Sequence, residues 1–143
     1  MTPDDPVLAV SGLTTSFRSA RDGWTSVVRD LDFTIAPRET VAVVGESGSG
    51  KSVTALSIMR LVAEATGRIE GSIRLDGTEL TTLPEREMRD VRGGRIGMIF
   101  QEPMTSLNPV LTVGYQVAEV LRRHRDMSAE EARAETLRLF DLV

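Results

Sequence analysis

The stretch Gly45-Glu-Ser-Gly-Ser-Gly-Lys-Ser52 constrains the fold most, because it matches the pattern G-x-x-x-x-G-K-[S/T] at every fixed position. It follows Thr40–Val44, an apolar β-branched run that is typical of a strand buried on both faces. It leads into Ser52–Val62, whose apolar residues have helical spacing. A strand, a glycine-rich loop and a helix in this order predict a P-loop, and therefore an α/β chain.

Each residue type in the motif suits the binding of a phosphate chain. Glycines let the backbone curl so that its N–H groups point at an anion, and the start of the next helix adds its positive end. The Lys51 ammonium can reach β- and γ-phosphates, and the Ser52 hydroxyl is a hard oxygen ligand for Mg²⁺. The alternative is a Gly/Ser-rich loop that precedes a lysine by chance. The expected nucleotide contacts are Gly45, Glu46, Ser47, Gly48, Ser49, Gly50, Lys51, Ser52 and Val53.

Composition excludes several other kinds of site. The chain has 17 basic residues, all arginine except Lys51, against 21 acidic residues, which gives a net charge of −4. This balance disfavours generic nucleic-acid binding. The absence of cysteine excludes disulfides, cysteine metal sites and cysteine nucleophiles, and a lone histidine, His124, disfavours a multi-histidine zinc centre. A GTPase would need an Asn-Lys-x-Asp motif, which is impossible when Lys51 is the only lysine.

The sequence indicates a soluble, cytoplasmic chain. Its longest apolar stretches, such as Val41–Val44, are four residues long, far too short to span a membrane. The start of the chain, Met1–Pro6, carries two aspartates and no apolar run, so it does not read as a signal peptide.

The remaining elements follow from hydrophobic periodicity and turn residues. Strands are expected at Val7–Phe17, Val27–Ile35, Arg68–Leu75 and Arg95–Phe100, with a turn at Asp76-Gly77. Helices are expected from Pro84 to about Arg92, around Val113–His124, and after a capping box formed by Ser128 and Glu131. Two groups of arginines are expected to face solvent because acidic residues lie among or beside them. They are Arg86, Arg89, Arg92 and Arg95, and Arg122, Arg123 and Arg125.

Gln101 ends the predicted strand Arg95–Phe100 and enters the proline-bracketed loop Gln101–Pro109. An amide there could hold Mg²⁺ or orient an attacking water. A purely structural role at the start of the loop is the alternative.

The P-loop, Gln101 and the run Ile99-Phe-Gln-Glu-Pro-Met-Thr-Ser-Leu-Asn-Pro-Val110 together resemble the ATP-binding subunit of an ABC transporter. Gly45–Leu56 and Gln101–Val110 resemble the dipeptide, oligopeptide, nickel and glutathione importer branch in particular. The resemblance implies an incomplete P-loop NTPase (RecA-like) core with an antiparallel β-subdomain and the start of a helical subdomain. It places the core and β-subdomain in residues 1–110 and the helical subdomain in residues 111–143.

The resemblance also implies roles and partners. ATP and Mg²⁺ are the implied cofactors, and Gln101 is expected to contact the Mg²⁺ and sense the γ-phosphate. The segment Glu102–Leu111 is expected to dock on membrane-spanning permease subunits. Phe17 is the favoured residue for stacking on adenine, with Trp24 as the competing candidate and packing as the alternative for either. A second ATP-binding subunit, identical or different, would complete the site, and the protein would sit on the cytoplasmic side of the cell membrane.

Several motifs of the family are absent from the sequence. It has no Leu-Ser-Gly-Gly-Gln signature, no Walker B strand ending in Asp-Glu and no D-loop. His124 lies in a predicted helix with no apolar strand before it, so it is not the family's switch histidine. These departures lead us to expect the N-terminal part of a longer subunit, with little ATP turnover by itself. A non-catalytic nucleotide-binding module and an ABC-type ATPase not linked to transport remain alternatives.

Overall fold

A computed structural model describes residues 5–19, 23–101 and 107–143. It divides into two compact units, one ending at Pro84 and the other running from Glu85 to Val143. Each unit is described by itself below. The domain division at residue 110 stays a prediction.

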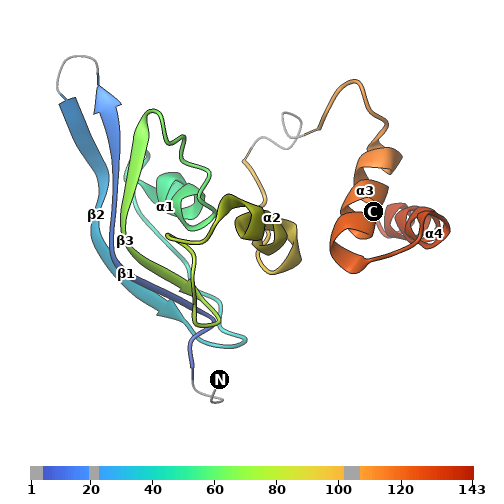
Figure 1. The fold of residues 1–143 in the computed structure, drawn as a ribbon, viewed down its shortest axis with the longest axis horizontal. Coiled ribbons are helices and arrows are strands. Elements are labelled where there is room, and N and C mark those ends of the chain that lie inside the picture. Colours follow the sequence, from blue (N-terminus) through green and yellow to red (C-terminus); the bar gives the residue numbers. More distant parts are fainter. Residues whose placement is uncertain (1–4, 20–22, 102–106) are drawn as a thin grey trace. The chain divides into compact units, whose positions relative to one another are not determined.

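The first unit is built on an antiparallel sheet with the strand order β2-β1-β3-β4 (Figure 1). The strands are β1 (Leu8–Ser19), β2 (Gly23–Ile35), β3 (Gly67–Leu75) and β4 (Thr78–Glu79). The predicted turn at Asp76-Gly77 is confirmed, because both residues have positive φ (47° and 77°), as a two-residue hairpin turn of this hand requires.

A bulge in β1 decides which side chains form the core of this unit. The register against both neighbouring strands shifts after Val10 and Ser11, next to Gly12, whose φ is 59°. The extra residue changes the parity of the strand, so Val10 and Leu13 are both buried although they are three residues apart. Other buried apolar side chains of the unit are Leu8, Val28, Met59, Val62, Ile73, Leu75 and Leu80.

Helix α1 (Lys51–Ile58) contacts the sheet at β1 and β2. The buried hydroxyls of Thr15 on β1 and Ser57 on α1 are joined by a 2.8 Å hydrogen bond. The helix is shorter than predicted from Ser52–Val62. It ends early because Arg60 has a φ of 49°, and the Arg60 guanidinium donates to the backbone oxygens of Leu80 and Leu83.

Glu79 holds the β3–β4 hairpin together. Its carboxylate accepts hydrogen bonds from the Ser72 hydroxyl, the Ile73 N–H and both the N–H and the hydroxyl of Thr81. Partial burial opposes ionisation, but these hydrogen bonds outweigh it and lower the pKa of Glu79 from 4.5 to about 2.

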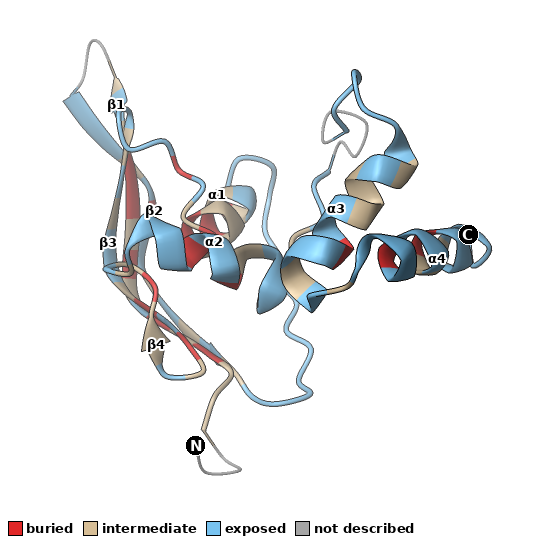
Figure 2. Ribbon diagram, turned by 45° about the vertical axis from the view of Figure 1, so that its right-hand side comes forward, coloured by how far each residue is buried: buried red, intermediate tan, exposed pale blue. Residues whose placement is uncertain are grey.

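The second unit contains the helices α2 (Glu85–Gly94), α3 (Val113–Arg125) and α4 (Ala129–Phe140). The predicted stop of α2 is confirmed, because the backbone leaves helical geometry at Arg92 and Gly93. The capping box at the start of α4 is also confirmed: the Ser128 hydroxyl accepts from the Glu131 N–H, and the Glu131 carboxylate accepts from the Ser128 N–H. Exposed residues predominate in α3 and α4 (Figure 2). The buried residues of these helices are Leu121, Ala132 and Thr136.

Two predicted strands are wrong. Thr40–Val44 pairs with none of the described strands, and its valines are exposed, Val44 by 89%. Arg95–Phe100 has only an isolated bridge at Ile96, and Ile99 is 96% exposed. A strand buried on both faces needs parallel neighbours and covering helices. The described sheet of the first unit is wholly antiparallel and does not include Thr40–Val44. The described part of the second unit contains helices and no named strand that could pair with Arg95–Phe100.

None of the helices in the described ranges is both long enough and apolar enough to cross a membrane.

The hydrogen bonds to Glu79 generate a pH-dependent stability prediction. Because the folded-state pKa lies below the unfolded value, the stabilisation is present above about pH 4.5 and is lost as the pH falls towards 2. We expect Glu79→Gln to lower the free energy of unfolding by about 1–2 kcal/mol at pH 7. Urea denaturation should show that this difference shrinks between pH 4.5 and pH 2. The exposed Glu64→Gln serves as control, and a difference that stayed constant over that range would contradict the prediction.

Candidate nucleotide-binding site

Residues Gly45–Gly50 form a curled loop that leads directly into α1. The Ser49 N–H donates to the Glu46 oxygen at 3.2 Å, which closes a turn around the middle of the loop. Gly48 has a φ of 83° in this turn. The residues from Gly45 to Ser49 are exposed, and Gly50 is buried.

Gly50 anchors the loop on the sheet. Its φ is 93°, and a Cβ there would lie 3.1 Å from the Val27 oxygen and 3.2 Å from Cγ2 of Val28. No residue with a side chain fits this backbone conformation and this close approach without displacing β2. The sheet therefore fixes the point at which the loop becomes α1.

The Lys51 side chain folds back across the loop. Its Nζ donates to the backbone oxygens of Gly45 and Glu46, both at 2.7 Å, and lies 3.3 Å from Oγ of Ser49. The ammonium is thus held against the backbone of the loop. A phosphate oxygen that replaced these carbonyls would form charge-assisted bonds, which are stronger than those to neutral acceptors.

The start of α1 supplies further donors. Gly50 is the N-cap and has no side chain with which to accept from the first-turn N–H groups, so the positive end of the helix carries no side-chain cap. Ser52 is exposed, and no described residue forms a hydrogen bond with its hydroxyl. These features fit a triphosphate and Mg²⁺, because they combine anion donors with a hard oxygen ligand.

The two aromatic candidates for adenine stacking lie on opposite faces of the sheet. Pairing of β1 with β3 is regular from Thr14 to Phe17, so Phe17 shares the face of Thr15, which bonds to α1. Arg68 pairs with Ser16 on the other face, and its guanidinium lies 4.6 Å from the centre of the Trp24 ring. Phe17 is half-buried on the α1 side, whereas Trp24 is 44% exposed and already stacked by a cation.

Gln101 belongs to the second unit, and its side chain is exposed. In the predicted docking segment Glu102–Leu111, residues 102–106 lie outside the described part of the chain. From Leu107 to Leu111 the chain is non-helical and exposed. The structure does not place Gln101 relative to the loop at Gly45–Ser52.

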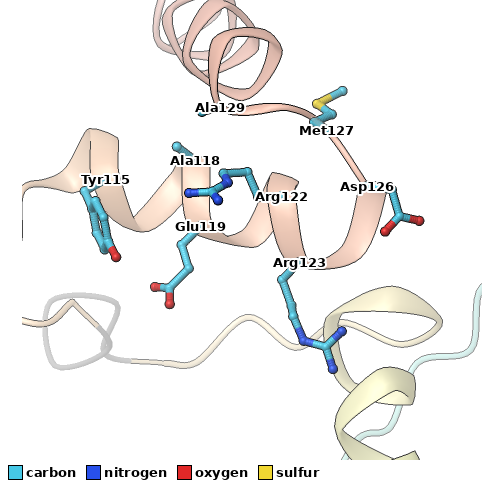
Figure 3. A pocket seen from close by; sticks show the side chains of 8 residues that line it. All are labelled: Tyr115, Ala118, Glu119, Arg122, Arg123, Asp126, Met127 and Ala129. Atoms are coloured by element: carbon cyan, nitrogen blue, oxygen red, sulfur yellow. The ribbon is translucent and has the colours of Figure 1, made fainter.

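A groove of about 580 Å³ lies along α3 and the start of α4 (Figure 3). It mixes charged and apolar side chains. The lining residues are Tyr115, Ala118, Glu119, Arg122, Arg123, Asp126, Met127 and Ala129. The predicted solvent exposure of the arginine runs is largely confirmed, although Arg92 is half-buried and pairs with Glu85, and Arg123 pairs with Asp90.

Sequence reasoning missed one contact of the second unit. The Gln116 side chain of α3 forms three hydrogen bonds to the backbone of Asn108 and Leu111. The sequence does show a polar residue, Gln116, on a helix that follows an Asn-Pro loop. No local pattern specifies the partners of Gln116, which lie eight and five residues before it.

The uncapped helix start, the curled glycine loop and the folded-back lysine together have the geometry of a P-loop. A sequence model of the family described as "ABC transporter" matches residues 28–141, a span that includes the loop and Gln101. The chain therefore belongs to the ABC transporter family.

Relatives and solved structures agree with this assignment. Two relatives carry the name "Putative peptide import ATP-binding protein": one of Brucella abortus (strain 2308) is 49% identical over 138 residues, and one of Brucella ovis is 52% identical over 145 residues. These alignments cover 96% of this chain but only 41% and 42% of the relatives, so the chain spans about two fifths of their length.

A dimeric ATP-binding cassette, solved in a post-hydrolysis state with bound ADP and Pi, superposes with a TM-score of 0.77 and 27% identity. The superposition covers 92% of this chain and 54% of that one. The predicted fold class, a P-loop NTPase core with an antiparallel β-subdomain, is thereby confirmed.

Gly50 and Gly48 form a matched pair for testing the anchor. Both have positive φ, but a Cβ at Gly48 would meet nothing within 4 Å. We expect Gly48→Ala to cost about 1 kcal/mol of stability through backbone strain alone. We expect Gly50→Ala to cost an additional ~1–3 kcal/mol, because the methyl group presses on β2. Equal costs in a urea titration would show that the contact with Val27 and Val28 is unimportant.

Proposed function

We propose that this chain is the nucleotide-binding part of an importer's ATP-binding subunit, in which ATP binding and hydrolysis drive uptake of peptides or a similar small solute. The observation that carries the proposal is the P-loop geometry, in which Lys51 lies across a glycine-rich loop at an uncapped helix start. The names of the relatives supply the transported class.

In this proposal Lys51 moves from the carbonyls of Gly45 and Glu46 to the β- and γ-phosphates of ATP. The backbone N–H groups between Gly45 and Val53 hold the phosphate oxygens, with Glu46, Ser47, Gly48 and Ser49 contributing through their backbone. The Ser52 hydroxyl is one ligand of Mg²⁺, which would neutralise phosphate charge during transfer. Because Lys51 exchanges neutral acceptors for charged ones, the exchange favours binding.

Gln101 is proposed as a second Mg²⁺ contact that senses the γ-phosphate. The segment Glu102–Leu111 is proposed to dock on membrane-spanning permease subunits. A second ATP-binding subunit would complete the nucleotide site, and the protein would work at the cytoplasmic side of the membrane. These four assignments rest on the resemblance to the family.

Phe17 is the proposed adenine-stacking residue. Its position on the α1 side of the sheet supports it, because α1 begins at the phosphate loop. Trp24 is the weaker candidate, since it lies on the opposite face and its ring is covered by Arg68.

Lys51→Arg tests the proposal without changing the net charge. A guanidinium is planar and bulkier than an ammonium, so it does not fit between the carbonyls of the loop and the phosphates. We expect ATP affinity, measured by calorimetry, to fall about ten- to a hundredfold. The exposed Arg29→Lys makes the reverse exchange outside the site and should bind ATP normally. Unchanged affinity in Lys51→Arg and Lys51→Ala would refute the proposal.

Trp24, the only tryptophan of the chain, offers a direct test of the aromatic assignment. We expect Phe17→Ala to weaken ATP binding by about 1–3 kcal/mol, the usual value of stacking on a base. We expect Trp24→Leu to leave it unchanged. Likewise, Trp24 fluorescence should stay constant as ATP is added to the unmodified chain. Strong quenching together with loss of affinity in Trp24→Leu would reverse the assignment.

A further inference from the structure

Helix α1 is attached to the sheet at two points. The first is its N-cap, Gly50, which packs closely on Val27 and Val28 of β2. The second lies seven residues further along the chain, where the Ser57 hydroxyl forms a 2.8 Å hydrogen bond with the Thr15 hydroxyl of β1. Seven residues of helix correspond to roughly 10 Å. Two points this far apart fix the direction of the helix axis on the sheet.

The direction of the bond between the two hydroxyls follows from their hydrogens. The Ser57 hydroxyl donates to the Val53 oxygen at 2.7 Å. Because a hydroxyl has one hydrogen, Ser57 accepts from Thr15, and Thr15 is the donor. Both side chains are fully buried, so bulk water does not replace either partner.

Thr15 also belongs to the strand segment that carries Phe17. The two residues lie on the same face of β1, about 7 Å apart along the strand. Across the sheet, Thr15 pairs with Val28, the residue on which Gly50 packs. Both attachment points of α1 are therefore in register with the strand segment that holds Phe17.

We propose that the hydrogen bond between Thr15 and Ser57 sets the angle at which α1 points its first-turn N–H groups relative to Phe17. This role rests on the proposed function, in which Phe17 stacks on adenine and α1 holds phosphates. Without the bond, α1 can swing about Gly50. ATP is held at both ends and cannot follow that movement, whereas a free polyphosphate is held at one end and can. Thr15 and Ser57 are positioning residues, because they act through the helix.

Calorimetric binding of ATP and of inorganic tripolyphosphate, both with Mg²⁺, tests this role. Thr15→Val keeps the shape of the side chain and removes the donor, and Ser57→Ala removes the acceptor. We expect each variant to weaken ATP binding about three- to tenfold, the equivalent of one hydrogen bond, and to leave tripolyphosphate binding unchanged. Thr15→Ser keeps the donor and should bind both like the unmodified chain.

The double variant Thr15→Val/Ser57→Ala separates positioning from stability. Ser57→Ala alone leaves the buried Thr15 hydroxyl without its acceptor, whereas the double variant leaves no polar group unpaired at this point. Urea titration should show that the double variant regains part of the stability lost in Ser57→Ala, while its affinity for ATP stays low. As a control, Thr136→Val removes another buried threonine hydroxyl, which donates to the Ala132 oxygen in the second unit. ATP affinity should not change in that variant.

The positioning role is overturned if Thr15→Val and Ser57→Ala bind ATP normally, or if they lose ATP and tripolyphosphate to the same extent. Recovery of ATP affinity together with stability in the double variant also overturns it, as does an equal loss in Thr136→Val. If ATP binding depends on Lys51 but not on Thr15 and Ser57, this role alone fails. If Lys51→Ala binds ATP normally, the proposed function fails and this role fails with it.

Discussion

The close approach of Gly50 to β2 is the constraint on which the glycine-rich loop at the candidate site depends. The loop from Gly45 to Ser49 is exposed, and its geometry is fixed at the far end, where Gly50 meets Val27 and Val28. The hydrogen bond between Thr15 and Ser57 holds α1 to the same sheet. The antiparallel sheet therefore orients the first turn of α1, and a displacement of β2 would also displace the start of that helix.

The features that could be predicted from the sequence are those set by neighbouring residues. The P-loop motif, the turn at Asp76-Gly77 and the capping box at Ser128 each depend on backbone preferences within a few residues. The glycine pair that follows Arg92 likewise marks the end of α2. The contacts of Lys51 also involve only residues of the same short loop, Gly45, Glu46 and Ser49, whereas the sheet depends on pairing between distant strands.

The features that could not be predicted depend on partners far away in the chain. Thr40–Val44 and Arg95–Phe100 have the composition of buried strands, but composition does not supply the neighbouring strands that such segments need. The bulge next to Gly12 changes which residues of β1 face the core, and simple alternation misses it. The bonds of Gln116 to Asn108 are polar contacts without a periodic signature.

The position of Lys51 has a chemical consequence of its own. Because every other basic residue is arginine, the chain carries a single side-chain amine, and that amine lies over the carbonyls of Gly45 and Glu46. An amine-acylating reagent would therefore modify one side chain, besides the terminal α-amine, and isotopically labelled lysine would mark one residue, next to the glycine-rich loop. Protection of the Lys51 amine from acylation would therefore report whether the candidate binding site of this chain is occupied.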